Sequence, residues 1–252
     1  MKLSKLIILI CMGVVLSAIG GYLLFGGGGD EGDEIIQEME QAAETADLTV
    51  EEIHYVETKG NKKEWELRAK SGQHFRKDDY TTLEDLTVTF YADEGRIITL
   101  RGDKGSMKGR KEIEVWGNVV IISSDGYRVR TSSLRYDDEK RQITTEDPIM
   151  LEGKEGLQVK GVGAVVYLKK KTLSILRKVR IMQGNREATS HKATYYHRES
   201  KLVLQGEPVV REGDNWVKGK RIIYYIDEQK SVAEGEGEER VTVTIIPREE
   251  KQ

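Results

Sequence analysis

The sequence predicts an all-β fold of stacked strands that follows a single N-terminal transmembrane helix. Three observations support this prediction: an uncharged stretch near the start of the chain, alternation of apolar and polar residues from Val50 onward, and a motif that recurs within the alternating region. The 252 residues are enough to bury a core. Basic and acidic residues, 40 and 43 in number, interleave with apolar ones, which argues against a long disordered chain.

Residues 6–25 contain no charged side chain. Twenty helical residues span about 30 Å, the thickness of the hydrocarbon layer of a bilayer. The alternative is a cleaved signal peptide, but the apolar run continues through Phe25 and exceeds the usual length of such a segment. Lys2 and Lys5 precede the run and the next basic residue is Lys59, which predicts a cytoplasmic N-terminus and a C-terminal domain outside the membrane.

Residues 26–49 are expected to form an acidic flexible tether. Four consecutive glycines open this segment, and carboxylates are frequent among the residues after them. A short helix within 34–46 is the alternative, because several apolar and alanine residues occur there.

The region after the tether alternates with a period of two, as half-buried strands do. Trp65, Leu67 and Ala69 alternate with charged residues, and Val88 and Phe90 alternate with threonines. The runs of this kind are 65–69, 86–90, 97–100, 113–115, 119–121, 127–131, 143–145, 149–151, 157–159, 165–168, 173–176, 179–182, 187–191, 201–204, 209–211, 216–218, 221–226 and 241–246. Turn-forming residues separate them, and the sequence predicts short strands throughout.

A motif also recurs, as GNVVI at 117–121, DPIML at 147–151 and GEPVV at 206–210. Leu134-x-Tyr136 and Ile222-x-Tyr224 occupy matching places in two of the units. Each unit is too small to close a core by itself and needs stacked neighbours. The sequence therefore predicts a quasi-one-dimensional architecture with open ends.

These segments resemble known families. WELRA at 65–69, LEDLTVTFY at 83–91, GNVVI, LRYDD at 134–138 and DPIML, behind an uncleaved helix, resemble the periplasmic LptC component of lipopolysaccharide export. Residues 187–210 and 219–227 look like LptA/OstA-like repeats. The resemblance divides the chain into a transmembrane anchor (1–25), the tether (26–49), an LptC-like β-jelly roll (50–182), an LptA/OstA-like β extension of the same roll (183–247) and a tail (248–252).

The resemblance implies an open, slot-like β-jelly roll with a lipid-accepting groove. It implies a protein of the inner membrane and periplasm that takes lipopolysaccharide from an inner-membrane ABC transporter and passes it to the next bridge protein, as part of outer-membrane biogenesis. The expected groove-lining residues are Trp65, Leu67, Val88, Phe90, Val115, Val119, Ile121, Leu134, Ile149, Leu151, Val159, Val179 and Ile181. The alternative is a dry sandwich core whose side chains contact only one another.

An open roll exposes unpaired backbone groups at its end strands, and these groups can pair with a partner. The resemblance implies that the N-terminal edge and the membrane helix meet the transporter permease subunits, and that the C-terminal edge meets an LptA-like bridge protein. An internal, paired strand is the alternative for 241–246. The edge residues are Leu48, Val50, Ile53, Val241, Val243 and Ile245.

Nothing in the sequence predicts catalysis, a cofactor or a metal site. The histidines form no HxH or HExxH motif, a single Cys excludes a CxxC site, and a formal net charge of −3 makes nucleic acid an unsuitable partner. A non-catalytic envelope scaffold or polysaccharide-binding β-repeat is the alternative function. Basic residues expected near the slot mouth can meet lipid phosphates or form a solvated face; they are Lys160, Lys169, Lys170, Lys171, Arg177, Lys178 and Arg180.

Overall fold

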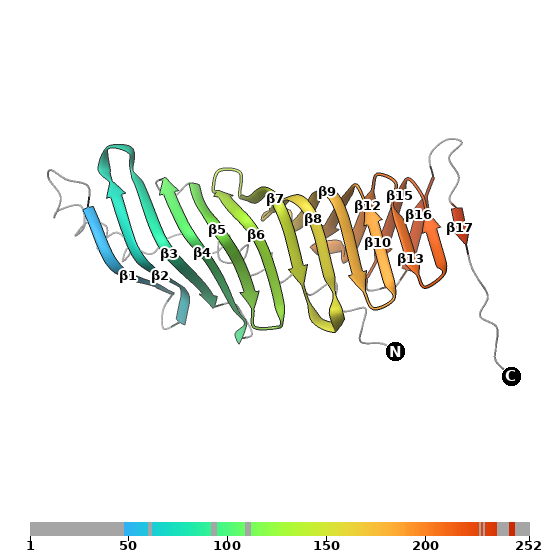
Figure 1. The fold of residues 1–252 in the computed structure, drawn as a ribbon, viewed down its shortest axis with the longest axis horizontal. Helices are drawn as coiled ribbons and strands as arrows, with labels where there is room; N and C mark the ends of the chain where they lie inside the picture. Colours follow the sequence, from blue (N-terminus) through green and yellow to red (C-terminus); the bar gives the residue numbers. More distant parts are fainter. Residues whose placement is uncertain are drawn as a thin grey trace.

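The computed structural model describes residues 48–59, 62–91, 95–108, 112–226, 228, 230–235 and 242–244. These residues form strands β1 to β17, laid side by side along one long axis (Figure 1). The predicted anchor, the tail and most of the tether lie outside the described residues. Within the described part, no helix has the length and apolar composition needed to cross a membrane.

The first nine strands are long and each pairs antiparallel with the next. Short 3₁₀ turns, η1 (Arg76–Asp78) and η3 (Lys154–Gly156), lie in two of the connections. The long strands are β1 (Leu48–Lys59), β2 (Lys62–Phe75), β3 (Tyr80–Tyr91), β4 (Ile97–Lys108), β5 (Glu112–Ser123), β6 (Tyr127–Asp137), β7 (Gln142–Glu152), β8 (Gln158–Tyr167) and β9 (Thr172–Gln183).

After β9 the sheet divides into two walls. One half of β9 pairs with β10 and the other half pairs with β11. The first wall continues through β10 (Arg186–Ser190), β13 (Val209–Glu212), β14 (Asn215–Lys218) and β17 (Thr242–Thr244). The second wall continues through β11 (Lys192–Tyr196), β12 (Lys201–Gln205), β15 (Arg221–Tyr225) and β16 (Lys230–Glu234), with the turn η4 (His197–Glu199) between β11 and β12. Each long strand therefore crosses both walls, whereas each later strand belongs to one.

The two walls join along a line that we call the corner, where the backbone takes left-handed conformations. Gly117 and Asn118 in β5 have φ of 78° and 47°, and the β5–β6 register shifts there. Gly206 and Glu207, between β12 and β13, have φ of 76° and 53°. These are the first two residues of the recurring motifs GNVVI and GEPVV, so in both places the repeat marks a corner at which the chain turns from one wall to the other.

The corner corrects one prediction. Runs 113–115 and 119–121, expected as separate strands, are two halves of β5. The same holds for 143–145 with 149–151 in β7, and for 157–159 with 165–168 in β8. The extra residues at the bend shift the alternation of apolar positions, so the sequence pattern breaks although the strand continues.

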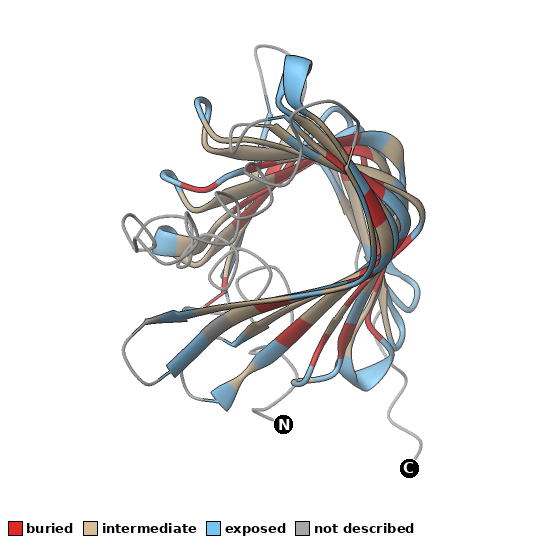
Figure 2. Ribbon diagram, turned by 90° about the vertical axis from the view of Figure 1, so that its left-hand side faces the viewer, coloured by how far each residue is buried: buried red, intermediate tan, exposed pale blue. Residues whose placement is uncertain are grey.

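The walls end at rims opposite the corner, and Figure 2 shows them joined on one side and separated on the other. On the second wall the rim is a stack of similar four-residue turns at 138–141, 168–171 and 197–200. Backbone hydrogen bonds connect each turn to the next, from Leu168 N to Arg141 O (3.0 Å) and from His197 N to Lys171 O (3.1 Å), and Ile226 N, directly after β15, donates to Ser200 O in the last of them (2.8 Å). The described strands do not pair across the opening, so the predicted all-β, open architecture is confirmed there.

The predicted repeat is also confirmed by the register. Tyr136 and Tyr224, equivalent in the sequence motif, occupy one continuous row on the second wall. The row runs through Tyr136, Ile143, Val166, Leu173, Tyr195, Leu202 and Tyr224. Residues of one row share a face of the sheet because side chains alternate with a period of two.

Candidate functional site

The interior of the first wall carries an uninterrupted row of apolar side chains. Each member is the register partner of the next, and together they come from twelve strands. At about 4.8 Å between strands the row is roughly 50 Å long. We call it the apolar row: Tyr55, Leu67, Val88, Leu100, Ile121, Val129, Leu151, Val159, Ile181, Ala188, Val210 and Val217.

The burial of this interior changes along the axis. From β6 onward both walls contribute to one large apolar cluster, in which Leu168, Ile175 and Tyr195 are at most 1% exposed. Toward β1 the clusters are smaller, and Leu67, Val88 and Leu100 on the apolar row are only half-buried. The C-terminal interior is therefore packed more closely by the protein's own side chains than the N-terminal interior, although Ala188, Val210 and Val217 on the apolar row are half-buried there as well.

The predicted groove residues fall on these interior clusters, with one exception. Leu67, Val88, Val115 and Val119 belong to the cluster nearest β1, and Phe90 and Ile121 belong to the adjacent one, with Leu134 contacting both. Ile149, Leu151, Val159, Val179 and Ile181 belong to the large C-terminal cluster. The exception is Trp65, whose ring lies 4.9 Å from that of Tyr55. Lipid contact by these residues stays a prediction.

Sequence reasoning left several members of the apolar row out of the predicted groove. Tyr55, Leu100 and Ala188 are examples. Leu100 and Ala188 lie in predicted runs, and Tyr55 follows the predicted edge residues of the N-terminal strand, but only the register with neighbouring strands identifies the row. Alternation along one strand cannot show which residue of the next strand stands beside it.

The end strands differ at the two ends of the roll. Among the described residues, β1 pairs with β2 alone, and β1 carries Leu48, Val50 and Ile53, all half-buried. At the other end β16 pairs with β15, and β17 pairs with β14. Val243 lies in β17, whereas Val241 and Ile245 fall outside the described residues. The segment predicted as the C-terminal edge is therefore paired on one side, at the end of the first wall.

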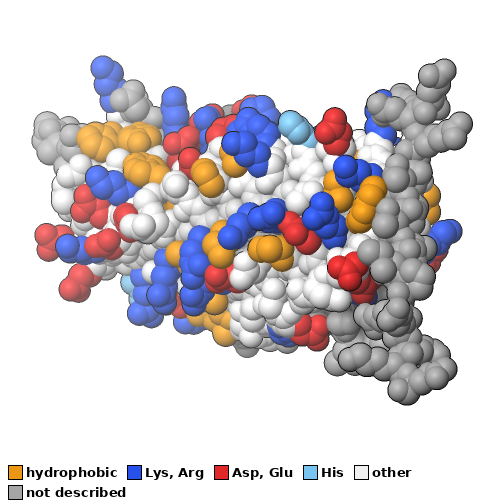
Figure 3. All heavy atoms as spheres, turned by 45° about the vertical axis from the view of Figure 1, so that its right-hand side comes forward, with side chains coloured by type: hydrophobic (Ala, Val, Ile, Leu, Met, Phe, Trp, Pro, Cys, Tyr) orange, Lys and Arg blue, Asp and Glu red, His pale blue; other side chains and the backbone are white. Residues whose placement is uncertain are grey.

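The basic residues expected at the slot mouth separate into two groups. Lys169, Lys170 and Lys171 lie in the rim turn between β8 and β9. The others lie away from the rims, so their expected position at the mouth is wrong. Alternation with buried neighbours turns Lys160 and Arg180 to the outer face of the first wall, and Arg177 and Lys178 lie beside the corner. Figure 3 shows basic side chains mixed with apolar and acidic ones on one outer face of the molecule.

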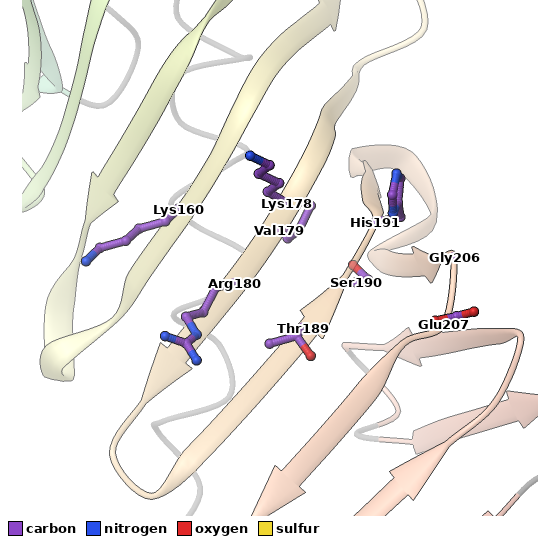
Figure 4. A pocket seen from close by; sticks show the side chains of 9 residues that line it. All are labelled: Lys160, Lys178, Val179, Arg180, Thr189, Ser190, His191, Gly206 and Glu207. Carbon is purple, nitrogen blue, oxygen red and sulfur yellow. The ribbon is translucent and has the colours of Figure 1, made fainter.

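A shallow depression of about 510 Å³ lies at this outer side of the corner. Lys160, Lys178 and Arg180 line it together with His191 and Glu207. The cationic side chains do not converge on a common point (Figure 4). Arg180 is moreover paired with Glu187, at 2.7 Å from Nε to Oε1. This arrangement does not form a closed anion site.

The outer face near β1 holds a buried carboxylate, Glu66. Its oxygens accept hydrogen bonds from Arg68 Nε (2.6 Å), Tyr91 Oη (3.0 Å) and, at 2.9 Å, interact with His54 Nε2. The hydrogen bond from Arg68 is the main cause that lowers the pKa of Glu66 to about 2, against an opposing effect of burial. Burial and the Glu66 carboxylate raise the pKa of Tyr91. These contacts connect side chains on the outer faces of β1, β2 and β3, so the cluster stabilises the pairing of these strands.

The described residues contain no group of three or more side chains that could hold a metal ion. His191 and His197 flank β11 at its two ends, with the five residues of the strand between them. A strand rises about 3.3 Å per residue, so the two imidazoles are too far apart to share a metal.

Comparison with known proteins gives one family match. The family model described as "Lipopolysaccharide-assembly, LptC-related" matches residues 14–184. Among solved structures, LptH from Pseudomonas aeruginosa, the LptA homologous periplasmic component of the lipopolysaccharide transport device, is similar at 16% sequence identity. The similarity covers 60% of this chain and 95% of that chain, with a TM-score of 0.30. No curated protein matches the chain.

Proposed function

Because the chain belongs to the LptC-related family of lipopolysaccharide assembly, we propose that it is a membrane-anchored periplasmic protein that binds lipopolysaccharide and transfers it. It takes the lipid from an inner-membrane ABC transporter and passes it to an LptA-like bridge protein. The protein performs no catalysis in this scheme, since the work of transport is supplied by the transporter. Residues 1–25 hold the entrance of the roll at the membrane, and 26–49 act as the tether.

The observation that carries the proposal is the apolar row. It gives acyl chains a continuous apolar path along the axis of the roll, with no charged side chain among its members. Each methylene removed from water contributes about 0.8 kcal/mol, so partial cover of a chain of about a dozen carbons amounts to several kcal/mol before ordering costs. The half-buried stretch at Leu67, Val88 and Leu100 supports acyl-chain entry at the β1 end.

The two ends of the roll support a direction of transfer. The β1 edge, which follows the tether, is proposed to pair with the β-rich part of the transporter permease. The end formed by β16 and β17 is proposed to pair with the bridge protein. In this proposal 50–182 and 183–247 are one continuous roll, and the change from long to short strands after Gln183 marks the added extension.

Lipid binding by the purified full chain in detergent tests the proposal. A variant carrying Leu67→Asp and Val88→Asp places two charges on the apolar row and is expected to weaken lipopolysaccharide binding at least tenfold, since a charge is costly in apolar surroundings. The matched control carries Thr87→Asp and Thr99→Asp, which add the same two charges at positions next to the apolar row but on the opposite face. Circular dichroism confirms that each variant is folded. Equal loss of binding by the two variants, or none by either, would refute binding inside the roll.

A further inference from the structure

Four cationic side chains gather on the rim of the second wall: Lys169, Lys170, Lys171 and Arg198. We call them the rim cluster. The first three occupy the turn between β8 and β9, and Arg198 lies in the adjacent turn η4. Backbone hydrogen bonding joins the two turns through His197 N and Lys171 O at 3.1 Å, and Arg198 Nη2 donates to Lys169 O at 3.4 Å. The four side chains therefore come from two turns that lie side by side.

The charge of the rim cluster is not neutralised by described carboxylates. Two of the neighbouring acidic residues are paired with cations outside the cluster: Asp138 with Arg141 at 2.7 Å, and Glu199 with Lys201. Lys170 lies over the ring of Tyr167, with Nζ 5.4 Å from the centroid, which leaves its charge uncompensated. The site thus presents positive charge to solvent, while Lys171 is half-buried and the other three are exposed.

The cluster lies directly beside the apolar interior. Leu168 precedes Lys169 in the same turn and is 1% exposed inside the large C-terminal cluster. Tyr195, from the strand that leads into η4, is fully buried in the same cluster. His197 stands between the two environments, and burial, followed by the Lys171 charge, lowers its pKa. The two rim turns therefore connect the buried apolar interior directly to the cationic side chains at the mouth of the roll.

We propose that the rim cluster binds the phosphate groups of a lipid whose acyl chains occupy the interior, an inference that rests on the proposed function. Arg198 supplies the planar fork that matches phosphate oxygens, and the lysines supply mobile point charges. The ligand class is thus an anionic, phosphate-bearing amphiphile. The position of the cluster fixes the head of the lipid at the second-wall rim near β8 and β9, with its tails directed inward.

Affinity measurements on the full chain with two ligands test this inference. The ligands are lipid A with its phosphates and lipid A with the same acyl chains but without phosphates. The rim variant carries Lys169→Gln, Lys170→Gln and Arg198→Gln, and leaves Lys171, with its φ of 52°, unchanged. The control variant loses the same charge from the outer face of the first wall through Arg101→Gln, Lys160→Gln and Arg211→Gln, all at exposed positions.

We expect the wild type and the control to bind phosphorylated lipid A roughly tenfold more tightly than the dephosphorylated form, a preference that falls as salt is raised. The rim variant is expected to lose this preference and to keep its affinity for the dephosphorylated lipid. Equal binding of both lipids by the wild type would overturn the inference while the proposed function stands, as would equal losses in the rim and control variants. Failure of the wild type to bind either lipid would overturn the proposed function, and this inference with it.

Discussion

The close packing of Ile175 against Gly161 allows the geometry of the corner to be tested by substitution. A Cβ added at Gly161 would lie 2.2 Å from Ile175 Cγ2 and 3.2 Å from the carbonyl oxygen of Arg177. Ile175 is 1% exposed, so it has little room to move. Overpacking of this kind costs about 1–3 kcal/mol. The alanine also restricts the unfolded chain, which returns about 0.4–1 kcal/mol, and the net loss expected for Gly161→Ala is about 1–2 kcal/mol.

A double-mutant cycle isolates the contact. Ile175→Ala removes Cγ2 and leaves a cavity, at a cost of about 2–5 kcal/mol. The methyl group of Gly161→Ala occupies part of that cavity, so the double variant is expected to lose about 1–2 kcal/mol less than the sum of the single losses. The free energy of unfolding is measured by urea denaturation of the full chain in detergent, followed by circular dichroism.

The control cycle combines Gly161→Ala with Ile181→Ala. Ile181 belongs to the same cluster but pairs with Val159 and does not appear among the nearest atoms to the Gly161 position. The two losses are expected to add within about 0.5 kcal/mol. A neutral Gly161→Ala variant, or additivity with Ile175→Ala, would show that the β8–β9 register at the corner differs from the one described.

Three further predictions concern the edge, the corner and the ends. Replacement Glu66→Gln is expected to lower the free energy of unfolding at neutral pH. The difference in unfolding free energy from the wild type should disappear as pH falls from about 4.5 toward about 2, because the Glu66 side chain, with its lowered pKa, stabilises the fold only while its carboxylate is charged. A difference that stays unchanged across this range would contradict the role of the charge. Replacement Asp147→Ala removes the acceptor of the Ser133 hydroxyl, 2.6 Å away, and should cost about 1 kcal/mol in urea denaturation. The control Glu146→Ala removes only an exposed, long ion pair with Arg177 at 3.5 Å and should cost less; equal losses would argue against the Ser133–Asp147 hydrogen bond. Photoreactive residues at Val50 and at Ala233 should capture the transporter permease and the bridge protein, respectively, by mass spectrometry of the adducts, and the reverse pattern would reverse the proposed direction.

The fold class was predictable from the sequence because alternation with a period of two survives wherever one face of a strand is buried. The division of the sheet into two walls was not predictable, since it depends on the residues at the corner whose backbone is in the left-handed conformation. Gly117 and Asn118 read as a turn between two strands, yet backbone pairing continues on both sides of them. Local patterns cannot separate a turn that ends a strand from a bend within it.

The candidate site was predictable in part. Residues such as Val88 and Ile121 follow from alternation and lie on the apolar row. The different positions of Lys169 and Lys178 could not be predicted from the sequence, because both lie in one basic segment. The length of β9 places Lys169 at the rim and Lys178 at the corner. The difference in side-chain burial between the two ends of the interior was also not predictable, because it depends on packing between the two walls and not on the pattern within one strand.

Site-specific photocrosslinking to lipopolysaccharide in membranes tests the central claim most directly. Photoreactive residues at Val88, Phe90 and Leu100 face the interior, and those at Thr87, Thr99 and Glu114 face outward. The account predicts lipid adducts from the first set and none above background from the second, with weaker labelling from Ile175 in the packed C-terminal interior. Equal labelling from both faces, or strong labelling from the outer set alone, would contradict transport through the inside of the roll.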